Sequence, residues 1–261
     1  RNKALKMLYF DYSDQVFGSE LLEDTIPVFT KLQTLSLRYC RVTKISPRAL
    51  EKYPDLRTLS LDGNPIGSKQ FEPLTSPLDW LKVFSLRNSN IRSDDRFTYQ
   101  AGNLMCNYPH LEGIDLSFNA LQQLPVFQGG MSCNATTLNS LVRFTADNNQ
   151  LEAFLKDYRN QSENLCLAFP YLRKISLNMN KLRYLDGLHM CEYLEELYLK
   201  ENHLGYGNQQ DSDRLSRVFS KLSNLKILNV ANNDMRLVDN RLLRGLTQLQ
   251  TLYFENNNLA S

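Results

Sequence analysis

The sequence predicts an α/β solenoid in which short repeats stack their strands into one parallel sheet. Leu and Asn dominate the composition, with 46 and 25 of the 261 residues, and such a bias is typical of an internal repeat. A spaced pattern, LxxLxLxxNxL, recurs along the whole chain. A hydrophobic content of 42% with a net charge of +2 is that of a globular chain with a continuous core.

The 30 basic and 28 acidic residues are interspersed along the chain. They form no charged tail or stripe that would grip a polyphosphate or an anionic membrane surface. No apolar run approaches the length of a membrane span, and the first residues lack the hydrophobic region of a signal peptide. The sequence therefore holds no direct evidence that this segment contacts nucleic acid or membrane.

Ten copies of the pattern recur at intervals of 22 to 31 residues. Their first leucines are Leu5, Leu32, Leu56, Leu81, Leu111, Leu141, Leu172, Leu194, Leu225 and Leu249. Residues two apart in LxL point to the same side of a short strand, so each copy contributes one strand with its leucines inward. One copy cannot bury that face alone, but ten stacked copies form a horseshoe with the parallel sheet on its concave face. Leu177 is then fully buried.

The asparagine of the pattern is expected to form hydrogen bonds with the backbone. Its side chain can donate to and accept from the backbone that turns away from the sheet and would otherwise be buried unpaired. The asparagines at this position include Asn119, Asn149, Asn180, Asn202, Asn233 and Asn257. Cys40 and Ser89 take this position in two copies, and Cys40 can fill it as a small buried group with a weak donor.

Apolar anchors spaced three to five residues apart follow the asparagine, as at Val42, Ile45, Leu50 and Tyr53. This spacing predicts an irregular or 3-10 convex side with little room for a full helix. Four copies are longer, and their extra residues are polar: 92–102, 128–136, 156–163 and 205–213. We expect these insertions to bulge from the convex side or edge.

The 24-residue copies carry anchors six and three residues before the next first leucine, as Leu50 and Tyr53 precede Leu56. They resemble the typical class of extracellular animal leucine-rich repeats. Copies of 30 or 31 residues, with glycosylation sequons and cysteines in their long parts, resemble Toll-like receptor ectodomains. That resemblance implies ligand sensing, and signalling by bringing two receptor chains together.

The chain departs from the receptor pattern, because it contains no cysteine-rich cap, transmembrane helix or signalling domain. It opens on a strand and stops in mid-repeat, so we interpret residues 1–261 as a single solenoid taken from a longer protein. Two other classes of protein stay open. One is an intracellular leucine-rich-repeat scaffold or regulatory subunit, and the other is an extracellular adhesion protein.

Five cysteines form no zinc or redox motif. Cys166 and Cys191 occupy core-anchor positions and Cys40 lies on the asparagine ladder, so these three are expected to be buried thiols. Cys106 and Cys133 lie off the core positions in adjacent copies, where a disulfide could form. The alternative is five reduced cysteines in a cytosolic protein.

Two sequons favour an extracellular or cell-surface location, or an endosomal lumen. Asn134-Ala135-Thr136 and Asn160-Gln161-Ser162 both lie in polar insertions on the convex side, where a glycan would not block the sheet. We expect Asn134 and Asn160 to be glycosylated.

Catalytic and metal-binding motifs are missing from the sequence. The three histidines stand in different copies, and no nucleophile elbow, phosphate loop or metal-ligand spacing accompanies them. Asp62-Gly63-Asn64 resembles part of a calcium loop, but it is the ordinary turn of the third copy. We expect a binding protein that is no enzyme and needs no cofactor or metal.

The candidate ligand-binding residues project from the concave face. They are Tyr9, Tyr12, Arg38, Tyr39, Phe118, Tyr198 and Tyr253. Aromatic side chains with charged neighbours are typical of protein-binding hot spots, and Tyr9, Tyr12 and Tyr39 are expected to cluster. The alternative is an unspecialised polar sheet, with Ser36, Ser60, Ser85, Thr145 and Ser176 at its middle positions.

The polar insertion 205–213 is a second candidate for partner recognition. Its residues Gly205, Tyr206, Gln209 and Asp211 include no apolar anchor, so we expect a loop outside the core that is either functional or passive. The expected partner is a protein or pathogen-derived ligand, with a receptor homodimer as a further prediction.

Overall fold

The computed structural model describes residues 4–13, 18–46, 48–67, 78–93, 108–125, 140–155, 164–205, 209–235 and 240–258. The chain forms two compact units. Unit 1 comprises Arg1–Ala120 and Pro125–Leu141, and unit 2 comprises Leu121–Leu124 and Val142–Ser261. In the described residues, no helix is long and apolar enough to cross a bilayer.

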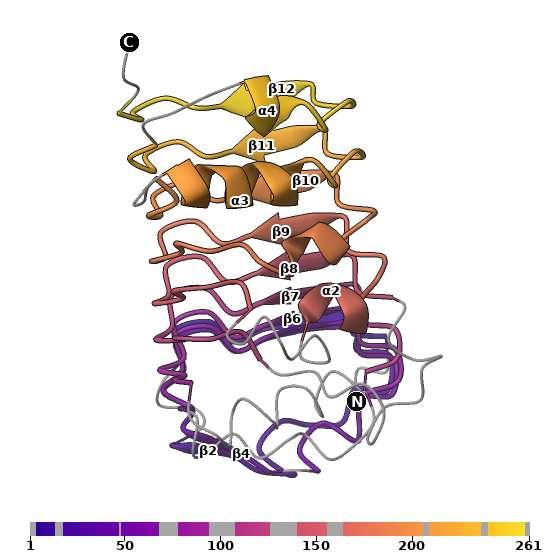
Figure 1. The fold of residues 1–261 in the computed structure, drawn as a ribbon. Helices are drawn as coiled ribbons and strands as arrows, with labels where there is room; N and C mark the ends of the chain where they lie inside the picture. Colours follow the sequence, from indigo (N-terminus) through magenta and orange to yellow (C-terminus); the bar gives the residue numbers. More distant parts are fainter. Residues whose placement is uncertain are drawn as a thin grey trace. The chain divides into compact units, whose positions relative to one another are not determined.

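One three-residue strand from each copy enters a parallel sheet in chain order (Figure 1). The strands of unit 1 are β1 (Met7–Tyr9), β3 (Thr34–Ser36), β5 (Thr58–Ser60), β6 (Val83–Ser85) and β7 (Gly113–Asp115). Those of unit 2 are β8 (Arg143–Thr145), β9 (Lys174–Ser176), β10 (Glu196–Tyr198), β11 (Ile227–Asn229) and β12 (Thr251–Tyr253). The predicted leucine-rich-repeat fold is confirmed.

The register aligns the central apolar residue of each strand with that of its neighbour. In unit 1, Leu35 pairs with Leu59, and Leu59 pairs with Phe84. In unit 2, Ile175 pairs with Leu197. These central residues are buried. Their neighbours in β5 and β10 are partly exposed, as the period of two predicts, whereas Ser36 in β3 and Ser176 in β9 are also buried. Leu177, which follows β9, is fully buried as predicted.

The asparagine ladder is confirmed in both units. Asn64, which is fully buried, accepts hydrogen bonds at Oδ1 from the backbone N–H of Cys40 and Val42, both at 3.0 Å. Its Nδ2 donates to the carbonyls of Leu37 at 2.7 Å and Leu61 at 2.8 Å. One side chain thus pairs backbone groups of two adjacent copies that no strand could pair.

The predicted role of Cys40 on the ladder is confirmed, and Ser89 also donates to backbone from its ladder position. Cys40 is a buried free thiol whose Sγ donates to the carbonyl of Phe10 at 3.0 Å. Ser89 Oγ donates to the carbonyl of Arg87 at 3.1 Å. Each donates fewer hydrogen bonds than an amide, because a thiol or hydroxyl has a single donor.

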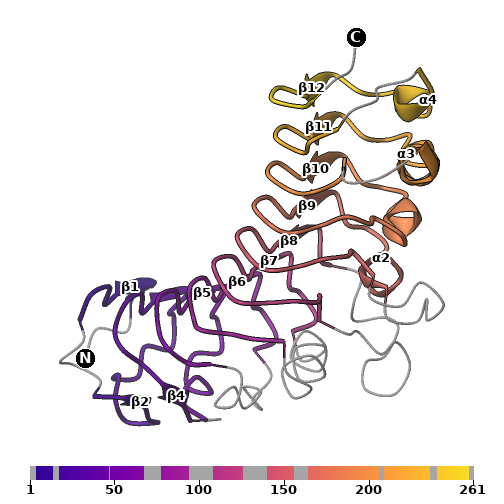
Figure 2. The same cartoon turned by 60° about the vertical axis from the view of Figure 1, so that its left-hand side comes forward.

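The side opposite the main sheet differs between the units (Figure 2). In unit 1 it carries a two-stranded parallel sheet of β2 (Glu20–Leu21) and β4 (Lys44–Ile45). In unit 2 it carries α2 (Leu165–Ala168), the 3-10 helix η2 (Leu188–Met190), α3 (Gln209–Phe219) and α4 (Asn240–Leu243).

Helix α3 corrects the expected loop at residues 205–213. Residues 209–213 form the first part of this 11-residue helix, which packs its buried residues Leu215, Val218 and Phe219 against the core. These apolar residues recur with the helical spacing of three and four. The longer copy therefore has room for an 11-residue helix, whereas the 24-residue copy that follows it holds the four-residue α4.

Gly205 is also packed rather than free in a loop. A Cβ atom there would lie 2.2 Å from the backbone oxygen of Asp234 in the next copy. Its N–H donates to the carbonyl of Asn233 at 2.9 Å.

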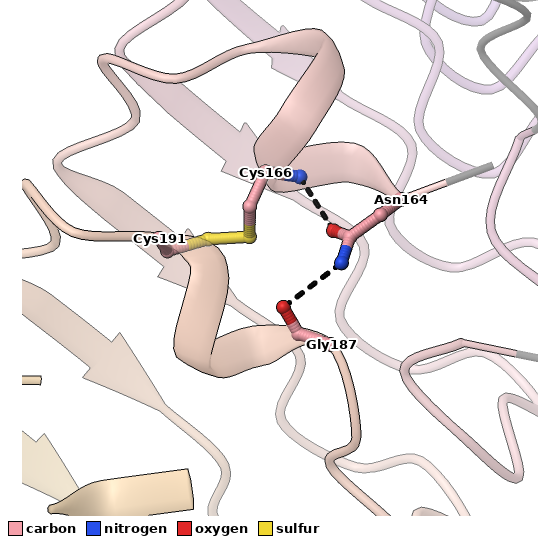
Figure 3. Close-up of a disulfide and its surroundings, with 4 residues drawn as sticks. All are labelled: Asn164, Cys166, Gly187 and Cys191. Carbon is pink, nitrogen blue, oxygen red and sulfur yellow. Dashed lines mark hydrogen bonds between the residues drawn. A yellow bond between two sulfur atoms is a disulfide. The ribbon is translucent and has the colours of Figure 1, made fainter. Parts of the chain in front are cut away.

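Cys166 and Cys191 form a disulfide, so the prediction that they are buried thiols is wrong (Figure 3). Both are buried, as their anchor positions require. Anchors of adjacent copies lie side by side, and the two Cα atoms are 4.9 Å apart, within bridging distance. Cys166 lies six residues before Leu172 and Cys191 lies three residues before Leu194. Their anchor positions in adjacent copies are the feature that could have identified the pair.

The buried Asn164 ties the same two copies together beside the disulfide. Its Oδ1 accepts from the N–H of Cys166 at 2.8 Å and caps α2, while its Nδ2 donates to the carbonyl of Gly187 at 3.0 Å (Figure 3). A Cβ at Gly187 would lie 2.7 Å from that Nδ2, so glycine is needed for this contact.

Candidate protein-binding surface

Each strand of the ten-stranded sheet is followed by a residue in the left-handed conformation, one position before the asparagine ladder. Bulky side chains occupy this position at Tyr12, Tyr39, Phe118 and Met179, with φ between 55° and 61°. This conformation is unfavourable for residues other than glycine, asparagine and aspartate. It turns these four side chains outward, and all are exposed.

Tyr12 and Tyr39 form a stacked pair on unit 1. Their ring centroids are 5.0 Å apart and the planes differ by 3°. Tyr39 also covers the backbone of Gly63, where an added Cβ would lie 2.2 Å from the ring atom Cδ1. Gly63 itself has a φ of +69°. Other copies hold larger residues at this left-handed position, so it is the contact with the Tyr39 ring that requires glycine at position 63.

Acidic and basic side chains alternate beside this pair along consecutive copies. Arg38 lies 4.0 Å from a carboxylate oxygen of Asp11 and 3.5 Å from one of Asp62. Arg87 lies 3.4 Å from Asp115. The carboxylates are more buried than the guanidinium groups, so the arginines remain about half exposed and available to a partner.

The side chain of Arg87 lies over the ring of Phe118. The guanidinium carbon of Arg87 lies 5.0 Å from the centre of the Phe118 ring, within the range of a cation–π interaction. We call Tyr12, Arg38, Tyr39, Arg87 and Phe118 the aromatic edge of unit 1. Its side chains are aromatic or arginine, and internal contacts hold them in place.

Tyr9 is exposed on β1, and its hydroxyl donates to the sulfur of Met7 at 3.6 Å. The stacking of Tyr12 on Tyr39 bears out part of the predicted tyrosine cluster. The position of Tyr9 in that cluster stays a prediction.

Tyr198 lies in unit 2, in an ionic cluster on β9 and β10. Its hydroxyl donates to Glu196 at 2.9 Å, and Lys174 Nζ lies 2.8 Å from the same carboxylate and 4.8 Å from the tyrosine ring centre. The hydrogen bond from Lys174 lowers the pKa of Glu196, and the same bond raises the pKa of Lys174. Desolvation raises the pKa of Tyr198. Tyr253 is exposed on β12.

A second polar ladder was missed by the sequence analysis. In three copies, an Asp just after the strand accepts a hydrogen bond from the serine that ends the next strand of the main sheet. The pairs are Ser36 to Asp11 at 2.5 Å, Ser85 to Asp62 at 2.6 Å and Ser176 to Asp147 at 2.7 Å. These serines are therefore specific partners of neighbouring carboxylates. The repeat spacing that aligns each Asp with the following Ser was the available signal.

Several predicted site residues fall outside the described residues. They are Cys106, Cys133, Asn134, Asn160 and Tyr206. The backbone of Gln209 and Asp211 belongs to α3.

The histidines do not converge on one site. His110 stacks on Trp80 with centroids 5.0 Å apart, and His189 lies in η2. Throughout the described ranges, no three His, Cys, Asp or Glu side chains are grouped to hold a metal ion.

Comparisons with known proteins agree with the repeat geometry. A family model described as leucine-rich repeats (2 copies) matches residues 30–76. Mouse podocan (Mus musculus) is 28% identical over 249 residues, which cover 87% of this chain and 36% of podocan. The match thus spans about a third of podocan's length.

A solved structure has a similar fold. It is the functional domain of InlJ from Listeria monocytogenes, described as including a cysteine ladder. It matches with a TM-score of 0.58 at 20% identity, covering 99% of this chain and 50% of that one. At this identity, the likeness concerns the fold alone.

Proposed function

We propose that this leucine-rich-repeat chain is an extracellular recognition domain that binds a protein partner through the aromatic edge of unit 1. The main evidence is the exposed stack of Tyr12 on Tyr39 beside Arg38, in which the Tyr39 ring packs against the backbone of Gly63. Tyrosine and arginine are enriched at interface hot spots. Side chains already fixed by stacking and ion pairing lose less conformational entropy on binding than free ones do.

The extracellular location is supported by the disulfide between Cys166 and Cys191. Disulfides persist in oxidising compartments and are rare in the cytosol. This bond favours a secreted or cell-surface protein over an intracellular scaffold. The sequons at Asn134 and Asn160 point the same way.

Ligand sensing with pairing of two receptor chains is the finer proposal, and the resemblance to Toll-like receptors supports it. An adhesion protein shares the same fold and location. Sedimentation with and without the bound partner discriminates between them, because a receptor of this kind forms a dimer only with ligand.

Photocrosslinking tests the proposed binding surface. The chain is secreted from eukaryotic cells with a photoreactive residue in place of Tyr12, which is 74% exposed, and is irradiated on the surface of intact cells. We expect discrete protein adducts that excess unmodified chain suppresses. A Tyr12→Ala/Tyr39→Ala competitor is expected to be weaker by roughly tenfold or more, as for a hot spot.

The matched control is a second exposed tyrosine pair in unit 2. Tyr171 and Tyr193 have ring centroids 5.4 Å apart, so Tyr171→Ala/Tyr193→Ala removes the same chemical groups elsewhere. We expect this competitor to act like the unmodified chain. Equal competition by both double variants would overturn the assignment of the aromatic edge.

A further inference from the structure

A groove between helices α3 and α4 of unit 2 lies apart from the aromatic edge and has a volume of about 410 Å³. Helix α3 is two-sided. Leu215, Val218 and Phe219 face the core, while Asp213, Ser216, Arg217 and Ser220 line the groove at helical spacing. The second wall comes from the next copy, with Arg241 in α4 and Arg244 just after it.

Gly245 brings the two walls together. A Cβ atom at this position would lie 2.3 Å from both the Cα and the carbonyl oxygen of Ser220. Backbone atoms cannot give way to such a contact, so a larger residue would push the end of α3 away from the segment after α4. The glycine thus places arginines of two copies on one groove.

The charge of the groove is positive. Three arginines face one aspartate, and Arg241 lies 3.5 Å from that residue, Asp213. Within the described part of the chain, no ion pair forms at Arg217 or Arg244. Both are exposed, so their guanidinium groups can reach a ligand from solvent.

Both serine hydroxyl groups of the groove already donate hydrogen bonds to backbone carbonyls. Ser216 Oγ donates to the carbonyl of Ser212, and Ser220 Oγ donates to that of Arg217, both at 2.9 Å. The donors left for a ligand are therefore guanidinium groups. Their planar fork matches an oxyanion with two acceptor oxygens, as in a sulfate or phosphate ester.

We infer that this groove binds a sulfate ester carried by an extracellular glycan. The choice of a sulfated glycan rests on the proposed extracellular function, because such polymers occur where a disulfide persists. An open groove with exposed arginines suits a linear polyanion. A phosphopeptide carries the same oxyanion chemistry and serves as the competing outcome in the test.

The test measures binding of a heparin-derived octasaccharide to the full chain by calorimetry, with a desulfated octasaccharide for comparison. We expect binding that requires sulfate and weakens as salt rises. Arg217→Gln/Arg244→Gln is expected to weaken it roughly tenfold or more, because two charge-assisted hydrogen-bonding groups are lost.

The matched control removes the same charge from unit 1. Arg48 and Arg57 are exposed, so Arg48→Gln/Arg57→Gln changes net charge equally without touching the groove. We expect its affinity to stay within about twofold of the unmodified chain, since distant exposed charges are screened. Equal losses in both double variants would overturn the site in favour of diffuse attraction, and so would unchanged binding by the Arg217/Arg244 variant.

Two further results separate this inference from the proposed function. A phosphopeptide that binds the groove as tightly as the octasaccharide, with the same arginine dependence, would overturn the glycan assignment. Tyr12→Ala/Tyr39→Ala is expected to keep octasaccharide binding, and Arg217→Gln/Arg244→Gln is expected to keep the crosslinked protein partner. Loss of octasaccharide binding in the tyrosine variant would overturn the groove as a separate site.

Discussion

Individual asparagine side chains hold this fold together in a way that a strand cannot. A three-residue strand pairs few backbone groups, and the chain turns away from the sheet immediately after it. Asn64 pairs the backbone on both sides of that turn with four hydrogen bonds of 3.0 Å or less. The leucines therefore need the asparagine, because their burial carries the turning backbone into the core with them.

Asn64→Ala tests that role. The change leaves two buried N–H groups and two carbonyls without their partner, and we expect a loss of roughly 2 to 4 kcal/mol in the free energy of unfolding. Urea denaturation measures it. Asn64→Cys is the companion variant, since Cys40 fills the same position naturally, and it should lose less. A loss below about 0.5 kcal/mol for the alanine variant would contradict the ladder's importance.

Leu177→Ala tests the core at the same scale. The side chain is fully buried after β9, so its truncation should cost roughly 2 to 5 kcal/mol through lost transfer free energy and a cavity. Thermal and urea melts measure the change. Leu167→Ala, at a side chain that is half exposed, is the control and should change stability much less.

Sequence could predict the ladder and the core residues because each follows from its position in the repeat. The aromatic edge was predicted less completely. Tyr12, Arg38, Tyr39 and Phe118 were candidates, but Arg87 joined them only through its distance to Phe118. The packing of the Tyr39 ring against Gly63 depends on the direction of the side chain, which sequence spacing does not give.

Among the elements, the strands were predictable and the convex segments were not. Every strand of the ten-stranded sheet carries the LxL signal or an apolar variant of it. In contrast, α3 begins inside a run of polar residues, and its apolar stripe starts only at Leu215. Polar composition at 205–213 favoured a loop. The helix forms because the following residues Leu215, Val218, Phe219 and Leu222 supply a continuous buried face.

The disulfide between the convex segments is expected to stabilise unit 2. It closes a loop of 25 residues, so Cys166→Ala/Cys191→Ala should lower the free energy of unfolding by roughly 3 kcal/mol. Urea denaturation with and without dithiothreitol measures this, and non-reducing peptide mapping should find the two cysteines linked. Recovery of both as free thiols from secreted protein would contradict the bond. Cys40→Ser, at the free thiol, is the control and should keep the sensitivity to reductant.

The charged pairs between β9, β10 and β11 predict a pH dependence. Hydrogen bonds from Lys226 and Lys174 lower the pKa values of Glu195 and Glu196, respectively. The folded state therefore holds these carboxylates ionised more strongly than the unfolded state does. Their contribution is complete above about pH 4.5 and is lost as pH falls through the lower folded pKa values.

Glu195→Gln/Glu196→Gln measures that contribution. At pH 7 we expect the variant to be less stable by about 1 kcal/mol or less per pair, because these side chains are partly exposed. The difference from the unmodified chain should shrink as melts are repeated towards pH 3. Glu192→Gln, at an exposed carboxylate just before this copy, is the control for loss of one negative charge, and a parallel trend in it would contradict the assignment.

At the scale of the whole molecule, fold and function rest on different kinds of evidence. Ten repeats of one pattern specify the sheet, and each repeat adds to the same prediction. The binding surface is built from side chains that differ from copy to copy, so repetition says nothing about it. The partner must therefore be found by experiment, whereas the compartment can be tested on the chain alone.

Glycosylation provides that test. When the chain is directed into the secretory pathway of eukaryotic cells, Asn134 or Asn160 is expected to carry a glycan, since both lie in sequons within polar insertions. Intact mass before and after glycosidase measures it, and Asn134→Gln/Asn160→Gln should remove the difference. The same chain made in the cytosol is the control and should show no glycan.

Secreted chain that is unmodified at both asparagines would remove this support, and the disulfide would then be the argument for an extracellular protein. In that case, reductant sensitivity of the native protein becomes the decisive measurement, because disulfides persist in oxidising compartments and are rare in the cytosol.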